Sequence, residues 1–164
     1  MAAFDKGTEQ FRAGEYKAAA TSFEEAYRLR PSWKIRFNIG QCRAAAKMYG
    51  RALEAFEAYL SEGGDDVPPE KKYDVINEIR NIRELVGYVD IEAAEGMTVH
   101  LDGEERGAAP LPGPVALSAG VNHRVVVILG DETVLDREVR VNSGNTLRVS
   151  AILNECRSRS PYLV

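Results

Sequence analysis

Apolar positions recur with two different periods along this chain, and the period changes near Gly87. In the first half, Tyr16, Ala19 and Phe23 fall at i, i+3 and i+7, the spacing of one face of an α-helix. From Tyr88 onward, apolar and polar residues alternate, as in residues 134–141, which is the period of a half-buried strand. The pattern predicts a helical half followed by a β half.

The helical half contains an internal repeat. Four residues of the first unit recur 33 positions later in the second unit. The pairs are Gly7 with Gly40, Tyr16 with Tyr49, Ala19 with Ala52, and Phe23 with Phe56. Each unit is predicted to be a helix, a short turn and a second helix, with the small glycine allowing the two helices to approach closely. Pro31 and Ser32 are expected to end the first unit and to cap the next helix.

A fifth helix is predicted from PPEKKYDVINEIRNIRELVG, residues 68–87. The two prolines suit a helix start, and Gly87 is expected to end the helix. Its apolar face is predicted to contain Tyr73, Ile76, Ile79 or Arg80, Ile82 and Val86. Two repeats would leave an apolar face open, so we expect this helix to cover the second repeat.

The alternating pattern of the second half predicts about six short strands with glycine-rich turns. This arrangement is typical of a small antiparallel β-sandwich. Asp102-Gly103 is a tight-turn signal, because aspartate tolerates a positive φ and glycine prefers one. The predicted fold class is therefore α+β with two domains: residues 1–87 are helical, residues 88–154 form the β-sandwich, and residues 155–164 are a tail.

Composition agrees with this division and excludes several classes of protein. Residues 88–164 contain twelve valines and no Phe, Trp or Lys, whereas residues 1–87 contain 11 of the 13 aromatic residues. The net charge of −4 lacks the basic field of a nucleic-acid binder. No apolar run approaches the roughly 18 residues of a membrane span, and the start, MAAFDKGTEQF, is not a signal peptide. We expect a soluble chain, although a leader or anchor could have been trimmed.

The segment GEYKAAATSFEEAYRLRP, residues 14–31, resembles the tetratricopeptide repeat (TPR). The positions that match the family pattern in register are Gly14, Tyr16, Ala19, Phe23, Ala26 and Pro31. The chain departs from the pattern where Ala3 and Arg36 replace a tryptophan, Gln10 and Arg43 replace a tyrosine, and Gly64 replaces a proline.

This resemblance implies a concave groove, lined by the first helix of each repeat, that binds peptides or partner helices. The family's groove positions fall on Phe4, Asp5, Thr8, Phe11, Arg12, Lys34, Phe37, Asn38, Gln41 and Ala45. Some family members hold a terminal carboxylate with Asn and Lys, and Asn38 and Lys34 fit two of those positions. Asp5 stands where another asparagine is expected, and its charge would repel a carboxylate.

The β half is similar to the PEGA domain, a small β-module. Its Pro-Glu-Gly-Ala tetrapeptide reads Ala94-Glu95-Gly96-Met97 here and keeps only the middle two residues. Better matches follow at Val99 to Gly103, Gly107, residues 109–111, Leu117, Gly120, His123 and Val125. The resemblance implies a bacterial protein and a place at the periplasm or cell envelope, although composition leaves the compartment unknown.

Candidate chemistry in the β half is sparse. Asp102, Glu104 and Glu105 could be cation ligands, but their spacing matches no EF-hand and a solvated acidic hairpin is the preferred interpretation. His100 and His123 have no metal or catalytic motif around them; His100 is expected to point outward and His123 to follow a turn. Neither a P-loop lysine nor a nucleophilic serine motif occurs, so we predict no catalytic residue, no metal and no cofactor.

Residues outside the motifs add little chemistry. Cys42 is expected to be a small buried residue, and Cys156 an exposed thiol in the tail. Trp33 is interpreted either as a partner anchor or, preferably, as a residue that joins the two repeats.

The sequence therefore predicts a non-enzymatic scaffold or adaptor. Its groove residues Thr8, Phe11, Arg12, Lys34, Phe37, Asn38 and Gln41 would bind a partner protein or peptide, and the β half would act as a spacer or docking module. Alternatives left open are carbohydrate or cell-surface binding by the PEGA-like module and self-assembly, as a homo-oligomer, through the solenoid end. A further alternative is a hydrolase without a recognisable motif. It would require an activity that disappears when Asp102 or His100 is changed.

Overall fold

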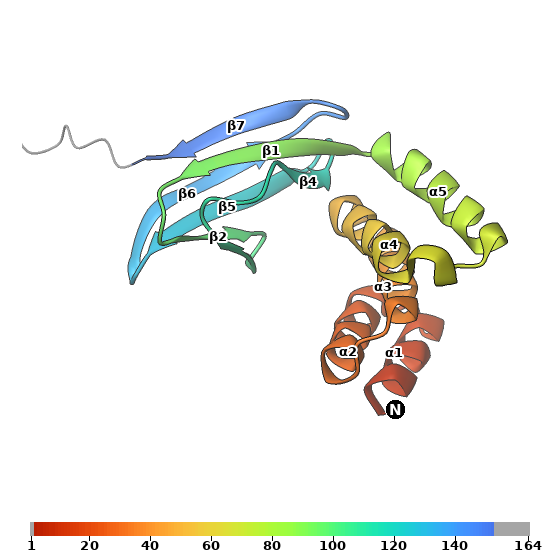
Figure 1. The fold of residues 1–164 in the computed structure, drawn as a ribbon. Helices are drawn as coiled ribbons and strands as arrows, with labels where there is room; N and C mark the ends of the chain where they lie inside the picture. The colour runs from red at the N-terminus through yellow and green to blue at the C-terminus, as the bar shows by residue number, and fades with distance from the viewer. Residues whose placement is uncertain (1, 153–164) are drawn as a thin grey trace, which may run out of the picture.

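A computed structural model describes residues 2–152 of the chain, in which helices precede strands (Figure 1). The five α-helices in this part are α1 (Ala2–Arg12), α2 (Tyr16–Leu29), α3 (Trp33–Ala45), α4 (Tyr49–Gly63) and α5 (Pro69–Arg83). A short 3₁₀ turn, η1 (Gly64–Asp66), connects α4 to α5. The predicted α+β class and the five helices are confirmed. Within the described residues, no helix is both long and apolar enough to span a bilayer.

The two predicted repeats are helical hairpins, α1 with α2 and α3 with α4. Their glycines lie directly against an aromatic ring of the second helix. A Cβ atom built on Gly40 would come within 2.7 Å of Cε1 of Phe56, and one on Gly7 would lie 3.1 Å from Phe23. The predicted close approach is therefore confirmed in both repeats.

A polar cluster joins the first repeat to the second. Tyr27 of α2 donates its hydroxyl to Glu62 of α4 at 3.0 Å, and Arg36 of α3 donates Nε to the same carboxylate at 2.9 Å. The Arg36 guanidinium also lies 3.8 Å from the centroid of the Tyr27 ring. Trp33, which we expected to join the repeats, instead packs within the second one, with its ring 5.2 Å from Tyr59 of α4.

Helix α5 starts at Pro69 as predicted but differs in its end and in its buried face. It ends at Arg83, and Gly87 belongs to the first strand, where it lies against residues 141 and 142. The buried face consists of Val75, Ile79 and Ile82, which pack against the second repeat. Tyr73 and Ile76, predicted on that face, are 68% and 40% exposed.

Seven strands in the described residues form two facing sheets. The strands are β1 (Val86–Ala93), β2 (Met97–Leu101), β3 (Glu104–Ala108), β4 (Val115–Ser118), β5 (Asn122–Leu129), β6 (Glu132–Arg140) and β7 (Thr146–Ala151). One sheet has the order β4-β1-β7 and the other β3-β2-β5-β6. All pairs are antiparallel except β1 with β7, which is parallel. The tail, with Leu153 and Cys156, lies outside the described residues.

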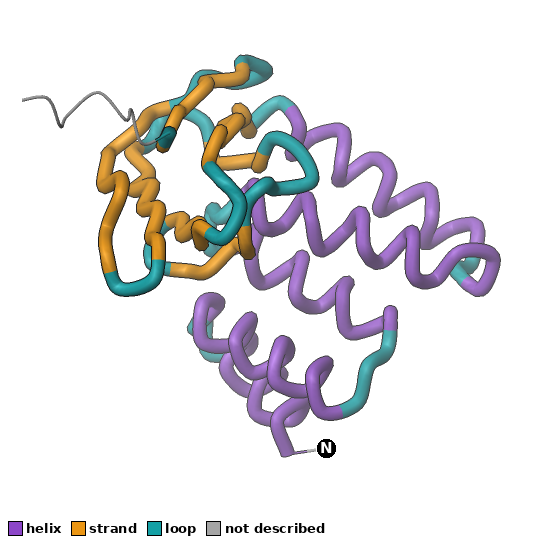
Figure 2. The backbone as a smooth tube through the Cα atoms, turned by 60° about the vertical axis from the view of Figure 1, so that its left-hand side comes forward, coloured by secondary structure: helices purple, strands orange, loops and turns teal. Residues whose placement is uncertain are grey.

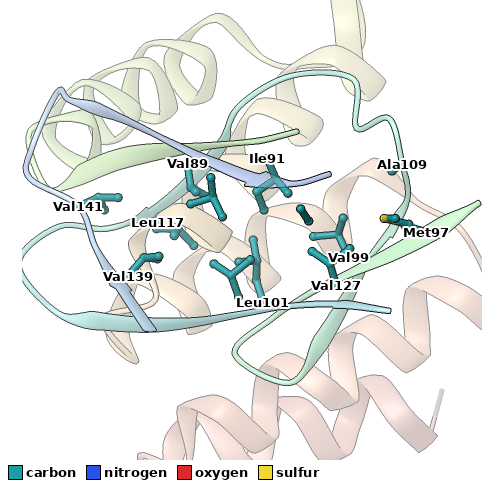
Figure 3. Close-up of a cluster of buried hydrophobic side chains, with 13 residues drawn as sticks. Val89, Ile91, Met97, Val99, Leu101, Ala109, Leu117, Val127, Val139 and Val141 are labelled. Atoms are coloured by element: carbon teal, nitrogen blue, oxygen red, sulfur yellow. The ribbon is translucent and has the colours of Figure 1, made fainter. Parts of the chain in front are cut away.

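Alternation along the strands fills the space between the two sheets with small branched side chains. Figure 3 shows Val89 and Ile91 of β1 pointing toward Val99, Leu101 and Val127 of the opposite sheet. Asp102 and Gly103 form the turn between β2 and β3 with φ values of +53° and +82°, which confirms the predicted tight turn.

The helical and β halves share a buried boundary. Val86 and Ala116 of the β half belong to the same apolar cluster as Ala52 and Phe56 of α4. At the start of α4, the Tyr49 amide donates to Ser118 Oγ at 3.0 Å. Figure 2 shows the strands lying beside one end of the helical hairpins, and the chain passes directly from α5 into β1. We therefore expect the two halves to depend on each other for stability.

Candidate functional site

The first helix of each hairpin and α5 together line a surface with two adjoining hollows. One hollow, of about 310 Å³, lies between α1 and α3; the other, of about 340 Å³, lies between α3 and α5. Phe11 of α1 and Gln41 of α3 line both, so the hollows form one continuous surface. We call this surface, lined by α1, α3 and α5, the groove.

Most of the predicted groove residues converge there. The α1–α3 hollow is lined by Phe4, Thr8, Phe11, Arg12, Phe23, Asn38 and Gln41. The α3–α5 hollow is lined by Phe11, Phe37, Gln41, Ala44, Phe56, Asp74, Val75 and Glu78. Six of the seven predicted site residues therefore line one surface: Thr8, Phe11, Arg12, Phe37, Asn38 and Gln41.

Lys34 is the predicted site residue that lines neither hollow. Its ammonium lies 5.4 Å from the centroid of the Trp33 ring, at the start of α3. Of the two residues Lys34 and Asn38, which lie one helical turn apart on α3, only Asn38 lines a hollow of the groove. A carboxylate clamp built on this pair has no support in the geometry.

Aromatic side chains form the floor of the groove and are fixed by their neighbours. The Phe37 ring lies 5.8 Å from that of Phe56 and 5.5 Å from that of Tyr59, and the Phe11 ring lies 5.4 Å from that of Tyr16. Phe11 and Phe37 keep part of their surface exposed. Because packed rings lose little further freedom on binding, they suit the apolar anchor of a partner.

The charged side chains on the rim of the groove differ in sign between its two ends. Arg12 is exposed at the α1 end, and Asp74 and Glu78 are exposed one helical turn apart at the α5 end. Lys71 of α5 lies 6.0 Å from the centroid of the Phe37 ring. The groove can therefore contact apolar side chains with its floor and discriminate charge along its length.

The contribution of α5 to the groove was missed at the sequence level. The sequence predicts α5 only as a cover for the second repeat, although a helix that follows two hairpins takes the place of the first helix of a third repeat. Asp74, Val75 and Glu78 could have been found from that position, because they lie on one face at i, i+1 and i+4.

Glu104 of the β half differs from its prediction as a solvated turn residue. It is half-buried and accepts a hydrogen bond from Arg51 Nε at 2.8 Å, and Arg43 lies at 3.4 Å. Burial alone would raise the pKa of Glu104, but the hydrogen bond and charge of Arg51, with Arg43 and Arg106 nearby, hold it below its usual value. The neighbouring Glu105 is exposed, as predicted.

His123 follows the turn before β5, as predicted, but is also buried. Its Nδ1 lies 2.6 Å from the Asp102 carboxylate and its Nε2 lies 2.9 Å from the Ser118 carbonyl. These contacts link the β2–β3 turn to the β4–β5 turn. His100 is half-buried at an outward position of β2. Among residues 2–152, no group of three His, Cys, Asp or Glu side chains is arranged to hold a metal ion.

A model of the tetratricopeptide repeat family matches residues 4–67. These residues are similar to tetratricopeptide repeats. The match covers α1 to η1 and therefore both hairpins, while α5 and the strands lie beyond it. Repeats of this family are in general non-catalytic and mediate protein–protein interaction. No curated protein and no solved structure gives a significant match to the chain.

Proposed function

We propose that the protein is a non-enzymatic scaffold whose groove binds a segment of a partner protein. The observation that carries the proposal is the continuity of the two hollows, which share Phe11 and Gln41 and extend from α1 to α5. The match of residues 4–67 to tetratricopeptide repeats supports a protein as the ligand.

The rim favours a partner segment of particular chemistry. A segment with an apolar side chain would place it on Phe11 and Phe37, where burial of apolar surface contributes roughly 25 cal/mol per Å². A basic residue of the segment would lie beside Asp74 and Glu78. We therefore propose an amphipathic segment with basic residues at the end that meets α5.

The proposal is tested by retention of partners from a lysate of the source cell, with the full chain as bait. The full chain is needed because Val86 and Ala116 belong to the same buried cluster as α4. Asn38→Ala with Gln41→Ala shortens two groove side chains, whereas Glu25→Ala with Arg28→Ala changes two exposed side chains of α2 outside both hollows. A protein lost by the first variant and kept by the second supports the groove. Equal retention by all three baits contradicts it.

For the β half, we propose a PEGA-like module that acts as a spacer or docking unit, in keeping with the resemblance and with a place at a bacterial envelope. Its support is the small two-sheet sandwich and the Asp102-Gly103 turn. A carbohydrate-binding role has less support, because Tyr88, the one aromatic residue between 86 and 152, is half-buried against the helical cluster.

Self-assembly through α5 is a second candidate, favoured by exposed apolar groups at the solenoid end. A hollow of about 580 Å³ between α4 and α5 is lined in part by Leu60, Ile76 and Ile79. Tyr73 and Ile76 are 68% and 40% exposed on the same helix. A molar mass that rises with concentration, and that Ile76→Glu returns to the monomer value, would support self-assembly. A monomer at all concentrations would exclude it.

A further inference from the structure

A third hollow, separate from the groove, lies where the two halves of the chain meet. It has a volume of about 470 Å³ and is bounded by the α3–α4 turn, the β2–β3 turn and the β4–β5 turn. We call it the junction hollow. Its lining contains five cationic side chains from both halves of the protein: Lys17, Arg43, Lys47, Arg51 and Arg106.

The two carboxylates that line the junction hollow are already occupied by other partners. Glu104 accepts from Arg51 and lies beside Arg43. One oxygen of Asp102 lies 2.6 Å from His123 Nδ1, and the other accepts the Arg124 amide at 2.9 Å. Both acids are therefore held by neighbouring groups, and each still contributes one negative charge to the hollow.

The remaining acids nearby balance the arginines but not the lysines. Glu24 pairs with Arg43 at 2.7 Å, and Glu54 pairs with Arg106. Within residues 2–152, neither Lys17 nor Lys47 has a carboxylate within ion-pair distance. With the three arginines offset by Glu24, Glu54 and Glu104, the two lysines stand against Asp102 alone, and the junction hollow has a small excess of positive charge.

Two arginines in the wall of the junction hollow are buried, and each is paired with a carboxylate. The Arg43 side chain is 6% exposed, and its buried Nε has no hydrogen-bond partner in the described part of the chain. The Arg106 side chain is 9% exposed. Its burial, together with the charge of Arg51, lowers the pKa of Arg106 in spite of the attraction of Glu54. An anion in the hollow would add a further charge-assisted contact for these guanidinium groups.

The N-terminus of α4 forms part of the wall of the junction hollow, where Gly50 is buried against the Ala116 carbonyl. The Tyr49 amide donates to Ser118 Oγ, while in the described residues the amides of Gly50 and Arg51 donate to no other group. Both of these residues line the junction hollow. The start of a 15-residue helix carries partial positive charge, which favours an anion nearby.

We propose that the junction hollow binds a small molecule that carries a phosphate group. Guanidinium groups match phosphate oxygens in geometry, and lysine ammonium groups add charge without a fixed direction. The volume lies within the roughly 300–1,000 Å³ of small-molecule sites, so the hollow has room for a ligand larger than a single inorganic phosphate. Because both halves supply donors, the bound ligand would bridge them and stabilise the junction.

The test is calorimetric titration of the full chain with pyrophosphate at constant ionic strength, in a buffer free of phosphate. Lys17→Gln with Lys47→Gln removes the two unpaired cations of the hollow. Lys6→Gln with Lys72→Gln removes the same charge from exposed positions of α1 and α5 that line no part of it. The first variant is expected to bind roughly tenfold or more weakly, as for the loss of charge-assisted contacts, and the second to bind like the wild type.

Thermal unfolding supplies a second measurement on the same proteins. Pyrophosphate is expected to raise the melting temperature of the wild type and of the Lys6/Lys72 variant, but to raise that of the Lys17/Lys47 variant much less. Lack of both heat and thermal shift at millimolar pyrophosphate would overturn the proposal. An equal loss in the two variants would also overturn it, as would binding of a phosphoserine peptide without binding of pyrophosphate.

Discussion

Gly40 of α3 lies against the ring of Phe56 of α4 so closely that a Cβ atom at residue 40 would come within 2.7 Å of Cε1 of the ring. This contact repeats the one between Gly7 and Phe23, 33 residues earlier. The glycine determines how closely the two helices of each hairpin approach, and therefore where α3 presents its groove residues.

The first prediction is that Gly40→Ala destabilises the protein. Alanine favours a helix by about 1 kcal/mol over glycine, but overpacking against Phe56 costs typically 1–3 kcal/mol. The difference predicts a net loss of about 1 kcal/mol, and at most about 2 kcal/mol, in the free energy of unfolding by urea. Gly7→Ala, with a contact of 3.1 Å, should lose less. A Gly40→Ala variant as stable as the wild type would contradict this account of the hairpin.

The second prediction concerns acid and the ion pairs of Glu104. The pKa of Glu104 is lowered in the folded protein, so its ionised form stabilises the fold above the usual pKa of a glutamate. This contribution is lost as the pH falls through the lowered value. Urea unfolding at several pH values should show Glu104→Gln less stable than the wild type at pH 7, with the difference shrinking in acid. Glu105→Gln, at an exposed position, serves as the control, and an equal effect of both variants would contradict the prediction.

The third prediction is that Cys42 reacts slowly with thiol reagents. Its side chain is fully buried, as the sequence predicted, and burial raises the pKa of the thiol to about 11. Because the thiolate is the reactive form, labelling at pH 8 should require unfolding of the protein. In a Cys156→Ser background, labelling should be slow in buffer and fast in denaturant. Fast labelling in buffer would show that α3 does not bury this residue.

The fourth prediction is that the two halves unfold together. Val86, Ala116 and Phe56 belong to one buried cluster, and the Tyr49 amide donates to Ser118. The single tryptophan, Trp33, reports on the helical half through its contact with Tyr59. Unfolding in urea can be followed by Trp33 fluorescence and by hydrogen exchange of the β-sheet amides. The two measurements should give the same midpoint of the unfolding transition. Two separate midpoints would show that the halves are independent.

Features that depend on local chemistry were predicted from the sequence. The shift of 33 residues locates both hairpins, because each is held by contacts such as Gly40 with Phe56 between neighbouring helices. The turn at Asp102 and Gly103 follows from the backbone preferences of those two residues. Most of the groove positions, among them Asn38 and Gln41, were implied by the resemblance to tetratricopeptide repeats, and both residues line the α1–α3 hollow.

Features that depend on distant parts of the chain were not predicted. The parallel pairing of β1 with β7 joins strands that are more than 50 residues apart, and alternation alone does not specify a neighbour. Gly87 was interpreted as a helix end because its close contact with residues 141 and 142 cannot be seen in the sequence. Glu104 was interpreted as solvated because Arg51 lies 53 residues away from it.

The central claim, that the groove is the binding surface, is tested most directly by photo-cross-linking in the source cell with the full chain. A photoreactive amino acid at Gln41, which lines both hollows and is exposed, should give an adduct with one partner protein. The same amino acid at Glu25, on α2 outside the groove, should not. Asp74→Lys with Glu78→Lys should remove the Gln41 adduct if basic residues of the partner meet α5. Lack of an adduct at Gln41, or an equal adduct at Glu25, would contradict the account.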